Sequence, residues 1–267
     1  MLKALAFVRR DFRLEISYRL SFLLQIFGIF FSVFMFYYVS RLLGEAAVPY
    51  LTPYGGDYFS FVLIGIAFAG YFGVGLSGFA GSIRQAQMTG TLEAMLMSPT
   101  SVSTIVLCSS LWSYLMTSLR VLAYLAVGAV FLGVNLGRGN YPAALLILVL
   151  TIVTFSSLGI IAASFIMVLK RGDPVTWLFS TLSSLLGGVY YPISVLPPWL
   201  QRLSHLLPIT YSLRAMRFAL LQGYPLAALI PDISVLAIFS LILLPLSLLT
   251  FRYAVHRARV DGSLTHY

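Results

Sequence analysis

The sequence is poor in charge. Only 9% of its 267 residues are charged and 60% are hydrophobic, whereas charged residues make up about a quarter of an average soluble protein. Mean hydropathy is correspondingly high, at +0.94. This scarcity of charge excludes an ordinary soluble domain. It predicts an all-α integral membrane protein in which residues 1–267 form a single transmembrane domain.

Lysine, cysteine and histidine are nearly absent. Neither lysine, Lys3 or Lys170, follows a glycine, so the chain lacks the G-x-x-x-x-G-K-[ST] loop that cradles ATP phosphates. The single cysteine, Cys108, allows no disulfide framework. The three histidines lack the spacing of zinc ligands. We therefore expect no catalytic residues, metal or cofactor in this chain.

Carboxylates are also missing from the interiors of the long apolar runs. Ion-coupled transporters place Asp or Glu inside the membrane to titrate or to bind an ion. Here Asp57, Asp173 and Asp232 lie near the ends of the runs, where helix capping or solvation accounts for them. The pattern argues against a secondary transporter. The missing G-x-S-x-G and H-E-x-x-H motifs likewise argue against a membrane-embedded enzyme, although both remain as alternatives.

Six apolar runs are long enough to cross a bilayer, which takes roughly 20 residues. They cover residues 20–43, 58–82, 104–133, 142–168, 174–192 and 228–251. With an even number of spans, eleven Lys and Arg residues fall on one side and five on the other. The positive-inside rule then predicts that both termini are cytoplasmic. We expect the protein to lie in a bacterial inner membrane. The same rule accounts for the net charge of +9 without nucleic acid.

Residues 1–19 predict an amphipathic helix in the membrane interface. Apolar residues recur at helical spacing, opposite basic residues that suit anionic lipid headgroups. The alternative is a simple topology anchor. The apolar positions are Leu5, Val8, Phe12 and Ile16, and the basic ones are Lys3, Arg10 and Arg13.

A hydrophilic segment, residues 84–101, interrupts the apolar runs on the predicted cytoplasmic side. It predicts a short helix, because Glu93 suits the positive N-terminal end and Pro99 prevents further turns. One side of this helix is apolar, so we interpret it as a docking surface for a partner protein. The alternative is a surface turn. The predicted contact residues are Gly90, Thr91, Leu92, Glu93, Met95, Leu96 and Pro99.

Prolines divide residues 190–225 into pieces too short to cross a bilayer. They predict two half-length re-entrant helices on the outer side, packed in protein or beside a watery cavity. Arg214 and Arg217 share a face of the second piece, where they could meet an anionic substrate or lipid phosphates. Thr210 or Ser212 could cap that piece. The candidate outer-gate residues are Pro192, Pro197, Pro198, Pro208, Arg214 and Arg217.

One charge lies deep in an apolar run. Arg120 stands near the middle of residues 104–133, where burial in lipid costs roughly 2.5 to 3.5 kcal/mol. A polar stripe surrounds it, and a weaker stripe containing Gln25 runs along the first span. The arginine either lines a substrate pathway or is held by backbone carbonyls at a helix contact. The pathway candidates are Gln25, Ser110, Ser113, Thr117, Arg120 and Tyr124.

The order G-T-L-E-A-M-L-M-S-P at 90–99 resembles the coupling helix of type 2 ATP-binding-cassette exporters. The proline-rich run from Tyr191 to Arg217 is similar to the outer re-entrant helices of the same permease family. The resemblance implies a permease subunit that forms the translocation pathway as a dimer with a second permease copy. A separate cytoplasmic ATPase, which holds ATP and magnesium, would drive export of a lipid-linked glycan, a lipid or an amphipathic compound.

Overall fold

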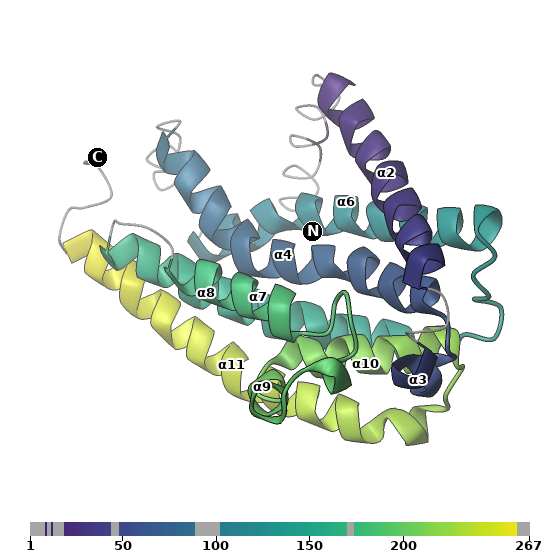
Figure 1. Ribbon diagram of the computed structural model, residues 1–267. Coiled ribbons are helices and arrows are strands. Elements are labelled where there is room, and N and C mark those ends of the chain that lie inside the picture. The colour runs from purple at the N-terminus through teal and green to yellow at the C-terminus, as the bar shows by residue number, and fades with distance from the viewer. Residues whose placement is uncertain are drawn as a thin grey trace.

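The chain folds into a helical bundle in which the described residues contain no strand (Figure 1). The computed structural model describes Arg9, Phe12 and residues 19–43, 48–88, 102–169 and 174–260. Five long helices carry most of these residues: α2 (Arg19–Leu43), α4 (Tyr58–Met88), α6 (Val102–Phe131), α7 (Tyr141–Leu169) and α11 (Leu226–Val260). Four shorter ones are α3 (Val48–Leu51), α8 (Pro174–Leu186), α9 (Pro198–Ser204) and α10 (Pro208–Leu221).

Five of the six predicted spans coincide with helices long and apolar enough to cross a membrane. The run at 174–192 differs, because its helix α8 has 13 residues. At about 1.5 Å per residue it is roughly 20 Å long, short of the roughly 30 Å hydrocarbon core. The helix ends because Gly188 adopts φ +74°, which breaks the helical path after Leu186. The described residues therefore contain five candidate spans, not six.

The helices arrange the connecting segments at two ends of the bundle. In Figure 1, α4, α7 and α11 finish at the end where the C-terminus lies, and α8 starts there. The opposite end, which we call the distal end, carries α3 and the α6–α7 and α10–α11 connections. Residues 89–101 join α4 to α6 and lie outside the described residues, as does most of the predicted interface helix at 1–19. The ring of Phe12 packs edge-on against Trp112 of α6, with the centroids 5.6 Å apart.

The bundle core centres on α4, α7 and α10. The α4–α7 contact is close because a Cβ on Gly75 would lie 2.6 Å from Cβ of Phe155, and one on Gly159 would overlap the carbonyl oxygen of Gly75. At the margin of the bundle, by contrast, 11% of the span in α2 is buried, against 67% of the span in α4. The interior is thus built around a glycine contact between two helices.

Sequence spacing suggests a different packing ridge on α4, formed by Gly65, Ala69, Gly73, Ser77 and Gly81. Of its glycines, only Gly65 meets a neighbour, the carbonyl oxygen of Val189. A Cβ on Gly73 or Gly81 would meet nothing within 4 Å among the described residues. Among the described residues of this chain, the ridge therefore makes no helix contact at those two positions, and α7 packs at Gly75 instead.

Candidate functional site

Helix α10 lies at the centre of the candidate site, and its sequence explains its start. The helix begins at Pro208, whose ring fixes φ and whose missing N–H is not needed in the first turn. The predicted cap by Thr210 or Ser212 is wrong. Thr210 Oγ1 donates to the carbonyl of Ser204 at 2.7 Å, and Ser212 shares a 2.6 Å hydrogen bond with Thr151 of α7. Ten of its fourteen residues are buried, because α10 packs against α4, α7 and α11.

Arg217 is buried in this packing, with 3% of its surface exposed. Its Nε donates to the carbonyl of Phe61 at 3.1 Å, and its Nη2 donates to the carbonyls of Gly188 and Val189 at 2.8 and 3.1 Å. The guanidinium carbon lies 3.5 Å from the centroid of the Phe61 ring, a cation–π geometry. One side chain thus joins α4, α10 and the segment after α8.

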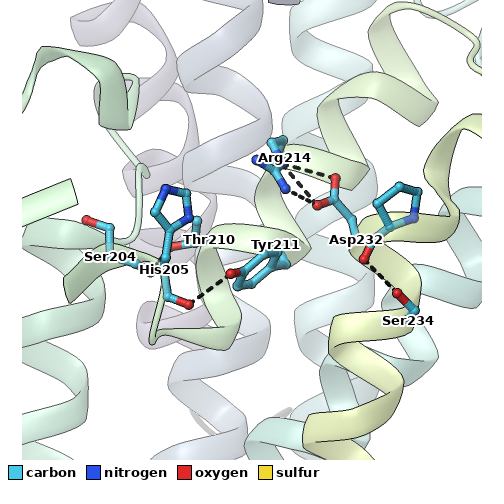
Figure 2. Close-up of polar contacts among 8 residues, drawn as sticks. Ser204, His205, Thr210, Tyr211, Arg214, Asp232 and Ser234 are labelled. Carbon is cyan, nitrogen blue, oxygen red and sulfur yellow. Dashed lines mark hydrogen bonds and ion pairs between the residues drawn. The ribbon is translucent and has the colours of Figure 1, made fainter. Parts of the chain in front are cut away.

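Arg214, three residues earlier, is paired with a carboxylate. Its Nε donates to both carboxylate oxygens of Asp232 on α11, at 3.0 and 3.1 Å, and its Nη2 also donates to Oδ1 (Figure 2). The Asp232 side chain is 7% exposed and that of Arg214 is 35% exposed. Tyr211 lies under the guanidinium and donates its hydroxyl to the His205 carbonyl at 2.9 Å. The pair ties α10 to α11.

These contacts correct two sequence interpretations. Arg217 is enclosed by protein, so it does not lie on an exposed outer face of α10. Asp232 is neither a solvated residue nor a helix cap, but a buried carboxylate inside the apolar helix α11. The sequence signal for it is a lone acidic residue within an apolar run, together with an arginine on the neighbouring helix.

Both arginines remain charged at neutral pH. Hydrogen bonding to Asp232 raises the pKa of Arg214 above its ordinary value. Burial lowers the pKa of Arg217 to about 9, which still leaves the guanidinium protonated at pH 7. Burial also raises the pKa of Tyr54, so its phenol stays neutral and can donate a hydrogen bond.

A cavity of about 240 Å³ opens beside these two side chains. Its walls come from the α3 region, from the segment that follows α8, and from α10. Tyr54 is fixed in the wall because it stacks on Phe218, with centroids 5.2 Å apart, and Phe218 stacks in turn on Tyr224. Of the predicted gate prolines, Pro192 lines the cavity, whereas Pro197 and Pro198 start α9 and Pro208 starts α10. The lining residues used below are Tyr50, Tyr54, Ser194, Arg214 and Arg217.

The deep arginine of α6 has a partner from another helix. Arg120 Nη2 donates to Oε1 of Gln25 on α2 at 2.6 Å. This helix contact is made with a side-chain amide and not with a backbone carbonyl, and the two polar stripes predicted on separate spans meet at this pair. Arg120 is exposed in the single chain, on the side where α2 and α6 have few buried residues.

The other pathway candidates on α6 are buried or half-buried. Ser110 and Thr117 are buried, and Thr117 Oγ1 donates to the carbonyl of Ser113 at 2.8 Å. Tyr124 is half-buried and packs against the core. A polar contact between α6 and α4 that sequence spacing does not reveal joins the hydroxyls of Tyr71 and Ser118 at 2.8 Å. The polar residues of α6 therefore contact two helices, α4 through Ser118 and α2 through Arg120.

The predicted partner-contact residues from Gly90 to Pro99 lie outside the described residues. What the structure gives is their position in the chain, between the end of α4 at Met88 and the start of α6 at Val102.

Comparison with known proteins gives a family match over most of the chain. A family model described as ABC-2 type transporter matches residues 5–221. The inner membrane transport permease YadH of Escherichia coli K12 is 37% identical over 94 residues, which are 35% of this chain and 36% of that protein. Nodulation protein J of Sinorhizobium fredii is 30% identical over 162 residues, 60% of each chain. The chain thus matches about a third of the length of the first relative and three fifths of the second.

Proposed function

Because the chain belongs to the ABC-2 type transporter family, we propose that it is the permease subunit of an ATP-driven exporter. In this proposal two permease copies form the translocation pathway, and a separate cytoplasmic ATPase supplies the energy from ATP and magnesium. The family match over residues 5–221 is the observation that carries the proposal. The helical bundle with five candidate spans, an integral membrane fold, is consistent with it.

The pathway is proposed to run along the side of the bundle where α2 meets α6. In the single chain, 11% of the α2 span and 22% of the α6 span are buried. Lipid alone could cover such surfaces, but Arg120 is costly to leave in hydrocarbon. A second permease copy facing Arg120 and Gln25 would give these polar groups a wet or protein-lined surrounding. This placement supports Arg120 as a contact for an anionic substrate.

The ATPase contact is proposed at residues 90–99. In the chain it follows α4 and precedes α6, and α4 finishes at the end of the bundle where α7 and α11 also finish. Besides the five candidate spans, α8 to α10 return the chain from this end to the distal end, where α11 starts. With that sixth pass the positive-inside count places both termini inside, so we propose that this end is cytoplasmic. Glu93 and the ridge of Leu92, Met95 and Leu96 would then make the contact.

Replacing Glu93 by Lys together with Leu96 by Asp is expected to abolish co-purification of the ATPase subunit. The double change reverses a charge and places a carboxylate in the apolar ridge, where an unpaired charge is costly at an interface. Tagged permease is purified from membranes that also express the ATPase, and the bound ATPase is quantified. The control is Arg138→Glu at the distal end, which should retain the ATPase. An undiminished ATPase yield with the double variant would contradict the proposed contact.

Replacing Arg120 by Ala is expected to lower export of an anionic substrate about tenfold, the loss that accompanies about 1.4 kcal/mol of interaction. Assembly should be intact, because Arg120 is exposed and its described contact is with the Gln25 side chain. Transport is measured in proteoliposomes that contain permease and ATPase. Gln25→Ala is the control, since it removes the contact and keeps the charge. Normal transport by Arg120→Ala would rule out the pathway role.

The proposed substrate is a lipid-linked glycan, a lipid or an amphipathic compound. The alternative functions, a secondary transporter or a membrane-embedded enzyme without an ATPase partner, have less support. The carboxylate inside α11, Asp232, forms an ion pair with Arg214, so it is not free to carry a coupled ion. In the described part of the chain, no three His, Cys, Asp or Glu side chains gather as a metal site would require.

A further inference from the structure

The distal cavity contains hydrogen-bond donors that the protein does not use. A guanidinium carries five N–H groups. In Arg217, Nε donates once and Nη2 donates to two carbonyls, whereas Nη1 donates to none of the described residues. Within the described chain, every fully buried side-chain nitrogen has a partner. Nη1 is therefore not sealed in the core, and the cavity that Arg217 lines is the space it can face.

The cavity also has an excess of positive charge. Of its two arginines, Arg214 is neutralised by Asp232, whereas Arg217 has only carbonyl oxygens and aromatic rings around it among the described residues. A buried cation with dipoles but no counter-ion attracts an anion, and the low dielectric of its surroundings strengthens the attraction. The second arginine adds to this attraction, because its Nη1 also donates to no described residue.

We propose that this cavity binds a phosphate group, carried by a lipid headgroup or by a small soluble molecule. Arg217 would donate from Nη1 at the floor, Arg214 would donate from its own Nη1, and Tyr54 would donate its phenol from the wall. Arginine suits phosphate because its planar N–H groups match the phosphate oxygens. The site lies within one chain and is independent of ATP-driven transport.

The size of the cavity limits the enclosed part of the ligand to a phosphate group with a few attached atoms. The cavity volume of about 240 Å³ is smaller than the roughly 300–1,000 Å³ of pockets that enclose drug-sized ligands. A phosphate with a few attached atoms fits this volume, whereas a whole lipid or glycan chain must extend out of it. The half-buried Tyr54 and the exposed Tyr50 provide apolar walls for the attached atoms.

Binding is tested with the full chain, purified alone in an uncharged maltoside detergent. The probes are inorganic phosphate, glycerol 1-phosphate and dihexanoyl-phosphatidylglycerol, and dihexanoylglycerol is the uncharged control. Affinity is measured by titration calorimetry. We expect binding of at least one phosphate probe and none of the uncharged control. Tighter binding of the phospholipid would identify a lipid headgroup, and tighter binding of a soluble probe would identify a free solute.

Two variants locate the binding in the cavity. Arg217→Gln is expected to weaken probe binding at least about tenfold, and its unfolding temperature without probe reports whether it still folds. Ser194→Glu does not touch the arginines and places a carboxylate at the exposed cavity rim; it should weaken binding to a similar extent. Its neutral counterpart Ser194→Gln should bind within about twofold of the original chain.

Arg138→Gln is the control for nonspecific charge, because it removes the same charge at the same end of the bundle but outside the cavity. It should bind within about twofold of the original chain. The proposal is overturned if no phosphate probe binds, if Ser194→Glu binds as well as Ser194→Gln, or if Arg138→Gln loses as much affinity as the cavity variants. If Arg217→Gln does not fold, the Ser194 pair decides the outcome.

Discussion

Replacing Gly159 by Ala is expected to lower the free energy of unfolding by about 3 kcal/mol or more, at the upper end of overpacking effects. The added Cβ would overlap the carbonyl oxygen of Gly75, which belongs to the backbone of α4 and cannot rotate away. The two helices must therefore move apart, and the surrounding contacts of Phe155 with Phe72 would loosen. The measurement is the unfolding temperature of the purified chain in one detergent.

Gly73→Ala is the matched control for this experiment. It makes the same substitution within α4, at a position where a Cβ meets nothing within 4 Å among the described residues. Alanine favours a helix over glycine by up to about 1 kcal/mol, so this variant should be as stable as the original chain or slightly more stable. Equal unfolding temperatures for Gly159→Ala and Gly73→Ala would contradict the close α4–α7 contact.

Replacing Asp232 by Ala is expected to cost about 2 kcal/mol of stability and to release α10 from α11. Breaking a fully buried ion pair costs about 3–5 kcal/mol. The cost is smaller here because the Arg214 side chain is 35% exposed, so water can screen the charge left behind. The loss should appear as a lower unfolding temperature and as faster proteolysis near the α10–α11 connection.

A double-mutant cycle separates the ion pair from other effects of the substitution. If the pair is responsible, Arg214→Ala combined with Asp232→Ala should cost less than the sum of the two single changes. Ser234→Ala is the control on α11, two residues from Asp232. Ser234 is exposed, and its hydroxyl donates to the Pro231 carbonyl and not to Arg214. Additive costs of the two single changes would show that Arg214 and Asp232 are not coupled.

The positions of the long helices could be predicted from sequence because the bilayer sets their length and composition. Five of the runs match helices within a few residues, apart from the extensions of α4 and α11 beyond the apolar stretch. The run at 174–192 was predicted to be a span but forms a shorter helix, because hydropathy does not show where the backbone leaves the helical path. Gly187, Gly188 and Val189 are apolar enough to continue a span, yet φ +74° at Gly188 ends the helix path.

The family could also be predicted, and the resemblance drawn from residues 90–99 and 191–217 is confirmed by the match over residues 5–221. The site was less accessible. Sequence spacing placed Arg214 and Arg217 on one face of a helix, but the contacts that each side chain makes depend on groups elsewhere in the chain. Arg217 binds the carbonyl of Phe61, 156 positions away, and a backbone acceptor leaves no signature in side-chain identity.

The pairing of Arg120 with Gln25 lies between these two cases. Both residues stand out as polar positions in apolar runs, and a buried polar group needs a partner. Sequence alone does not say which runs are neighbours, however, and the pair spans 95 positions. Asp232 was missed for a related reason, because its place near a span end made solvation the simpler explanation.

The uneven burial of the helices separates a tightly packed group, α4, α7 and α10, from the loosely packed helix α2. Helices α4 and α7 are held together by the glycine contact, Arg217 joins α10 to α4, and all three helices share the core. Displacing any one of them would therefore disrupt at least two of these contacts. Helix α2 would lose few buried contacts if it moved, since 11% of its span is buried. If an ATPase drives this protein as proposed, we expect α2 to move more easily than the other helices, about its contact between Arg120 and Gln25.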